Sequence, residues 1–225
     1  MSTDRDTPPS PPAVEPRTRL AAAAASIAGG AAVLLDAPVD IAGSENAVLN
    51  TAGVAAPVLA VLAVAGITAC LRRPGPLAGP GNRLLDLGAL ANIVGLVLLT
   101  GIEFSRVYVL FPLDEPVRDA LADSAPTMPA VYTAGILYVA GSMLFATALV
   151  RERFVPVASW LLLLTALPGT LVDVLPLALV AVFQAVAGAA FVLVGIHLLR
   201  ADRDRGGLGD HGTGAGVGRV TVVTG

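Results

Sequence analysis

Long apolar runs alternate with short polar stretches over most of the chain. Crossing a bilayer core of roughly 30 Å takes about 20 helical residues, and six runs come close to that length. They span about residues 20–42, 52–71, 84–105, 130–150, 156–175 and 176–199. The fifth is apolar without interruption only to residue 167, so we expect its helix to kink at Pro168 and Gly169. The pattern predicts an all-α polytopic membrane protein with six transmembrane helices in one bundle.

The two ends of the chain are polar. Residues 1–19 contain a proline-rich stretch and residues 201–225 contain eight glycines, so neither segment buries enough apolar surface to fold. We expect two disordered tails on a transmembrane domain of residues 20–200. The basic start also resembles a signal peptide, but no small-x-small cleavage site follows, which favours a retained first helix. Within the longest connection, residues 106–129, residues 117–121 predict a short surface helix.

The positive charges are all arginines and fall on alternate sides of the apolar runs. Only Arg106 and Arg118 lie on one side; the other twelve lie on the opposite side. Short loops that are rich in arginine stay on the cytoplasmic side of the membrane, so both termini are predicted to be cytoplasmic. Adding or removing one helix would scramble this alternation, which supports six spans independently. Arginine without lysine indicates a high-GC prokaryote, and we therefore expect a multi-pass protein of the prokaryotic plasma membrane.

The composition excludes several classes of protein. Hydrophobic residues make up 55% of the chain and charged residues 14%, whereas soluble domains carry roughly 25% charged residues. The single Cys70 rules out an intrachain disulfide and a CxxC metal site. The two histidines form no haem-ligand pair or metalloprotease motif, and the predicted spans hold no catalytic set. We expect no cofactor, no metal and no nucleic acid. The lipid bilayer is the expected partner, with a homo-oligomer or a membrane-protein partner left open.

Polar residues inside the predicted third span form a stripe. Glu103 and Arg106, three residues apart, can pair and so reduce the cost of burying either charge. Small residues on the same face permit close helix contact, and the polar ones face protein rather than lipid. An interfacial ion pair and one interhelical amide hydrogen bond would also explain the stripe. Its members, at spacings of three or four, are Gly88, Asn92, Gly95, Leu99, Glu103 and Arg106.

A second polar position lies in the sixth span, at Gln184. At 1.5 Å per residue, Gln184 and Asn92 differ in depth by about 6 Å, so we expect no direct bond but a shared polar path. Acidic residues end the first, third and fifth spans, and we hypothesise a shallow, outward-facing acidic vestibule over Gln184. Solvated helix ends without a common cavity are the alternative. The candidate path comprises Asn92, Glu103, Arg106, Asp173 and Gln184, and the vestibule adds Asp36 and Asp40.

The second half of the chain carries a family resemblance. The segments are Gly141-Ser142-Met143-Leu144-Phe145, Leu149-Val150-Arg151 and Val155-Pro156-Val157-Ala158-Ser159-Trp160-Leu161-Leu162. This pattern, over about residues 135–199, resembles uncharacterised six-helix bacterial membrane proteins of the DUF4386-like kind. In those proteins a glycine-bearing helix ends in arginine, and a proline and a tryptophan open the next. The resemblance implies a six-span fold and supplies no activity or site residues.

Two functional hypotheses follow from the sequence. The first is a non-enzymatic integral membrane protein with a structural, regulatory or assembly role, because intramembrane charge is scarce. The second is a small-solute or cation transporter that uses the acidic vestibule. The lack of a convincing inverted repeat weakens the second, since many transporters are built from one. Whether Asn92, Glu103, Asp173 and Gln184 share one cavity distinguishes the two hypotheses.

Overall fold

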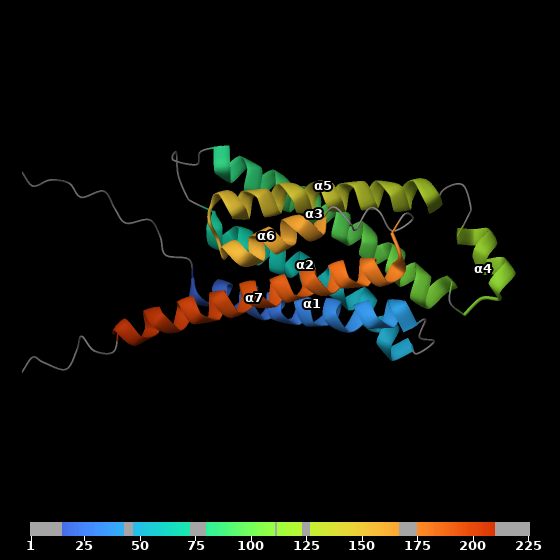
Figure 1. Cartoon of the computed structure of the whole chain (residues 1–225), viewed down its shortest axis with the longest axis horizontal. Helices are drawn as coiled ribbons and strands as arrows, with labels where there is room; N and C mark the ends of the chain where they lie inside the picture. The colour runs from blue at the N-terminus through green and yellow to red at the C-terminus, as the bar shows by residue number, and fades with distance from the viewer. Residues whose placement is uncertain are drawn as a thin grey trace, which may run out of the picture.

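The computed structural model describes residues 15–42, 47–72, 80–110, 112–122, 127–166 and 175–209. This part of the chain is all-α, with no strand (Figure 1). Five of its helices are long and apolar enough to cross a membrane. The elements are α1 (Pro16–Ala42), α2 (Ala47–Leu71), α3 (Pro80–Phe104), the π-helical η1 (Ser105–Leu110), α4 (Glu115–Ala122), α5 (Thr127–Arg151), α6 (Pro156–Ala166) and α7 (Leu177–Gly209).

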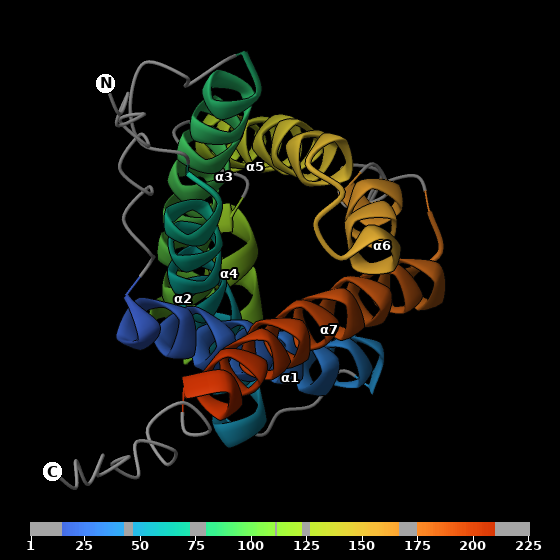
Figure 2. The same ribbon diagram turned by 90° about the vertical axis from the view of Figure 1, so that its left-hand side faces the viewer.

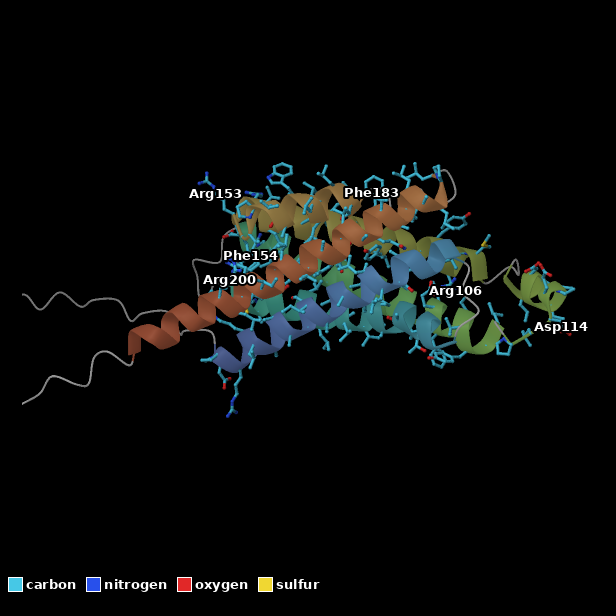
Figure 3. The ribbon with its side chains drawn as sticks, turned by 60° about the horizontal axis from the view of Figure 1, so that its bottom comes forward. Arg106, Asp114, Arg153, Phe154, Phe183 and Arg200 are labelled. Atoms are coloured by element: carbon cyan, nitrogen blue, oxygen red, sulfur yellow. The ribbon has the colours of Figure 1, made fainter. Side chains whose placement is uncertain are left out.

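Six helices pack side by side in a closed ring. Contacts run from α1 to α2, α3, α5, α6 and α7 in turn, and α7 packs back against α1. Figure 2 shows this ring end-on. The arginine end of the ring holds Arg153 and Arg200, and the α4 end holds Arg106 with Asp114 beyond it (Figure 3). Successive helices along the chain are neighbours in the ring, and the contact between α1 and α7 closes it.

Small residues set the closest helix crossings. Gly30 of α1 lies against the backbone carbonyl of Gly188 in α7, and Gly141 of α5 lies against the backbone of Asn92 in α3. A Cβ at Gly88 of α3 would come within 2.5 Å of the Phe145 backbone nitrogen in α5. Lipid provides no hydrophobic drive for helix association, so such small residues bring the helices into van der Waals contact.

The apolar side chains divide into an inner core and an outer surface. The largest fully buried apolar side chains lie toward the arginine end and include Val64, Ile67, Leu85, Leu149 and Val194. Many other large apolar side chains face outward, among them Leu62, Leu90, Val97, Ile136, Leu164 and Val182. A water-soluble bundle would cover its outside with polar groups, so this surface suits lipid.

One predicted span is described only in its first part. We predicted a fifth transmembrane helix over residues 156–175, but α6 ends at Ala166, and residues 167–174 lie outside the described residues. Eleven residues rise only about 16 Å, roughly half the thickness of a bilayer core. By itself, α6 is too short to cross.

Other helix ends extend past the predicted limits. Helix α1 begins at Pro16, where proline suits the first helical position and the Glu15 carbonyl accepts a 3.0 Å bond from the Thr18 amide. Helix α7 continues to Gly209, past the predicted end of the sixth span at residue 199 and into the segment that we expected to be a flexible tail. The α7 sequence contains no proline that would end the helix earlier. The predicted surface helix over 117–121 is confirmed by α4.

Candidate functional site

A cavity of about 550 Å³ lies within the ring. All six ring helices and η1 contribute to its walls. The volume falls in the range of small-molecule sites, roughly 300–1,000 Å³. Its polar wall residues are Asp36, Asn92, Glu103, Arg106, Tyr138, Ser142, Thr165 and Gln184.

Regular stripes on two helices define the depth of the cavity. On α7 the lining residues are Leu177, Val180, Gln184, Ala187 and Phe191, at spacings of three and four. On α3 and η1 they are Asn92, Leu96, Leu99, Glu103 and Arg106, with the same alternation. Each stripe covers fourteen residue steps, which at 1.5 Å per residue is about 20 Å. The cavity thus reaches from the α4 end to more than halfway through the bundle.

The cavity stops where the same stripes enter the packed core. Val194 and Leu198 continue the α7 stripe and are buried in the core cluster. Leu85 and Ala89 continue the α3 stripe in the opposite direction and belong to the same cluster. The bundle is therefore hollow toward the α4 end and close-packed toward the arginine end.

An ion pair lies on the wall near the α4 end. The Glu103 Oε2 atom accepts a 2.8 Å hydrogen bond from Arg106 Nε, and Arg106 Nη2 is also 2.8 Å away. Asp36 lines the cavity from α1, and its Oδ1 lies over Gly53 of α2, 2.9 Å from where a Cβ would be. Among the described lining residues, two carboxylates and one guanidinium sum to a formal charge of −1.

The π-helical segment η1 positions Arg106 at the end of α3. Its wider turn continues the long third helix, and π-helical turns recur at functional sites. The segment is held by Tyr108, whose hydroxyl lies 3.1 Å from Thr51 Oγ1 of α2. The Tyr108 ring also packs on Phe104, with ring centroids 5.0 Å apart. These contacts fix η1 against α2, so that Arg106 stays on the cavity wall.

Two carboxamides on opposite walls each carry an unpartnered oxygen. Asn92 Nδ2 donates a 2.6 Å hydrogen bond to Ser142 Oγ. Among the described residues, Asn92 Oδ1 and Gln184 Oε1 are buried and have no partner. Leaving a buried acceptor unsatisfied costs about 1–3 kcal/mol. A polar side chain that lowers stability in this way inside a membrane protein is a candidate for a functional role.

The structure brings together most of the residues proposed from the sequence. Asp36, Asn92, Glu103, Arg106 and Gln184 all line the one cavity. The segment that holds Asp173 and the side chain of Asp40 lie outside the described residues. Asn92 bonds to Ser142 rather than to Gln184, in line with their different depths.

Three polar wall residues escaped the sequence analysis: Tyr138, Ser142 and Thr165. The α5 wall residues Gly135, Tyr138, Ser142 and Phe145 recur at spacings of three and four. Applying the stripe rule to this helix would have found two of the three. The third, Thr165, lies on α6. Its hydroxyl donates a 2.9 Å hydrogen bond to the Leu161 carbonyl within the same helix.

The wall chemistry is suited to binding. Within the described ranges, no three histidine, cysteine, aspartate or glutamate side chains converge as a metal site. Charged groups lie near one end of the cavity, amides and hydroxyls lie deeper, and apolar side chains fill the remaining walls. Comparison with known proteins adds no assignment: no family model, curated protein or solved structure matches this chain.

Proposed function

We propose that this chain is a non-enzymatic, multi-pass membrane protein that admits a small solute into the central cavity, as a small-solute or cation transporter. The supporting observation is that Asp36, Asn92, Glu103, Arg106 and Gln184 line one cavity. Separate helix faces would have favoured a purely structural role for each polar residue. A shared cavity gives them a common ligand instead.

The proposed orientation places the α4 end outside the cell. Arg17 and Arg83 lie in the first turns of α1 and α3, Arg72 follows α2, Arg153 lies between α5 and α6, and Arg200 lies within α7 at the same end of the ring (Figure 3). Arginine is retained on the cytoplasmic side, so we place that end and both termini in the cytoplasm of a prokaryotic cell. In this proposal α6 and the residues that follow it form a sixth span. The cavity then opens outward.

A regulatory or assembly role is the second candidate, and the packed floor of the cavity favours it. Val64, Ile67 and Val194 are fully buried toward the arginine end. A transporter has to open this floor during its cycle, whereas a solute-sensing protein keeps it closed. The resemblance to DUF4386-like proteins stays a prediction and agrees with either role. Both candidates require a cavity that water and solutes reach from outside.

A pair of cysteine variants on α7 tests this shared requirement. Gln184 lines the cavity, whereas Val182, two residues away, is 55% exposed on the outside of the ring. In a Cys70→Ser background, a membrane-impermeant thiol reagent added to intact cells should label Gln184→Cys. It should leave Val182→Cys unlabelled, because thiolate forms in water and not in lipid.

The two variants differ by two residues on one helix, so differences in expression or depth have little effect on the comparison. Labelling of Gln184→Cys only after the cells are permeabilised would reverse the proposed orientation. Absence of labelling from both sides would show that water does not reach the cavity, and the proposed function would fail.

A further inference from the structure

We propose that the solute is a small organic monocation, a protonated primary or secondary amine on an apolar body. This inference rests on the proposed function and names the ligand class of the same cavity. Three properties of the walls carry it: their charge, the kind of hydrogen-bonding atom they leave unpartnered, and their apolar content.

The charge of the walls selects a cation. The described lining residues include two carboxylates, Asp36 and Glu103, and one guanidinium, Arg106, so their formal charges sum to −1. Charges interact more strongly inside a protein than in water, so a cavity of this sign favours one positive charge and disfavours an anion. A zwitterion would need a cationic side chain for its carboxylate, and the Arg106 guanidinium already binds Glu103 at 2.8 Å.

The unpartnered atoms select a hydrogen-bond donor. Asn92 is 5% exposed, and its Oδ1 and the Gln184 Oε1 lack partners within the described chain. Both are acceptors, one from α3 and one from α7, so a ligand that bonds to either atom has to donate the hydrogen. Each atom exposes less than 1 Å² to water, so the amides must rotate toward a ligand that enters. An ammonium with N–H groups supplies the missing donors, whereas a quaternary ammonium has none.

The remaining walls select an apolar body. Leu96, Leu99, Phe145, Phe183 and Phe191 line the cavity. Burying a hydrocarbon or aromatic group there is favourable, and aromatic faces also attract cations. A bare metal ion would need several converging oxygen ligands, and the described walls contain no acidic cluster of three. The combination points to an amphiphilic amine rather than to an inorganic cation.

Four probes of similar shape separate these contributions. The full chain in lipid nanodiscs at pH 7 is equilibrated by dialysis with 2-phenylethylamine, 2-phenylethanol, 3-phenylpropionate or the trimethylammonium analogue of the amine. We expect the amine to bind, and the alcohol and the carboxylate to bind at least tenfold more weakly. The trimethylammonium analogue should bind about tenfold more weakly than the amine, because it keeps the charge and loses the donors.

Variants assign the effect to the cavity. Asp36→Asn should reduce amine affinity about tenfold or more, whereas Glu115→Gln, the same change of charge on exposed α4, should alter it less than twofold. Gln184→Leu should narrow the difference between the amine and its trimethylammonium analogue. Thr147→Val is its control, because the Thr147 hydroxyl bonds within its own helix to the Met143 carbonyl at 2.6 Å.

Each outcome decides the inference. Equal or tighter binding of the alcohol or the carboxylate overturns it, as does an amine affinity that Asp36→Asn leaves unchanged. If no probe binds while Gln184→Cys is labelled from outside, the ligand class is wrong and the open cavity stands. If Gln184→Cys is not labelled either, the proposed function fails with it.

Discussion

At the scale of single residues, the two unpartnered carboxamide oxygens connect stability with function. Asn92 is tied to Ser142 through its nitrogen, so part of its polarity serves helix packing. The buried Gln184 Oε1 atom has no partner among the described residues. Inside apolar surroundings, an acceptor without a donor lowers stability. Helix packing therefore gives a reason for the Asn92 side chain but not for the Gln184 oxygen. We expect substitutions at the two positions to change the free energy of unfolding in opposite directions.

Replacing Gln184 with leucine should stabilise the protein. Gln184→Leu removes a buried unpartnered acceptor and keeps most of the side-chain volume, so the free energy of unfolding should rise by about 1 kcal/mol. Asn92→Ala should lower it by about 1 kcal/mol or more, because the Ser142 bond and packing are lost. Thermal unfolding of the ligand-free protein in detergent measures both. A large loss of stability in Gln184→Leu would show that this amide has an essential structural partner.

At the scale of elements, the stripe on α3 shows what periodicity can predict. Spacings of three and four put Asn92, Leu99, Glu103 and Arg106 on one face, and that face lines the cavity. The π-helical η1 was not predicted. It is held against α2 through the Tyr108 and Thr51 contact, which leaves no local pattern in the sequence.

The crossing of α3 and α5 should tolerate no side chain at Gly88. A Cβ there would lie 2.5 Å from the Phe145 nitrogen and 2.8 Å from the Leu144 carbonyl carbon, and backbone atoms cannot turn aside. Gly88→Ala should therefore lower the free energy of unfolding by about 2 kcal/mol or more. Gly101→Ala is the matched control in the same helix, because its Cβ would meet nothing within 4 Å.

Thermal unfolding in detergent compares these two glycine variants. Gly101→Ala should raise stability by about 0.5–1 kcal/mol, because alanine loses less conformational freedom in a helix than glycine does. Similar behaviour of the two variants would mean that α3 and α5 do not cross this closely.

At the scale of the whole molecule, the chain places apolar groups outside and polar groups inside. Outward leucines and valines such as Leu62 and Val182 suit lipid, while the charged and amide groups converge on the interior. Loop lengths in the sequence predict which successive helices are neighbours. They do not predict that α1 and α7 close the ring, because that contact joins distant segments through Gly30 and Gly188. The common cavity follows from this closure, and the sequence supported it only as a hypothesis.

The orientation of the molecule can be measured with a fluorescent fusion and one cysteine. A green fluorescent protein fused after Gly225 should fluoresce, because it folds in the cytoplasm, where we place the C-terminus. In the Cys70→Ser background, Asp114→Cys should react with an impermeant thiol reagent on intact cells, because Asp114 is exposed beyond the α4 end. A dark fusion together with an unreactive Asp114→Cys would mean that the orientation is inverted.

The central claim is a bundle that is hollow toward the outside and closed toward the cytoplasm. Cysteines placed singly along one stripe of α7, in the Cys70→Ser background, test it with an impermeant reagent applied to intact cells. Val180, Gln184 and Ala187 line the cavity, whereas Val194 and Leu198 lie on the same face within the core. We predict that labelling is rapid at the first three positions and absent at the last two. Uniform labelling along the stripe, or labelling only at 194 and 198, would contradict the account.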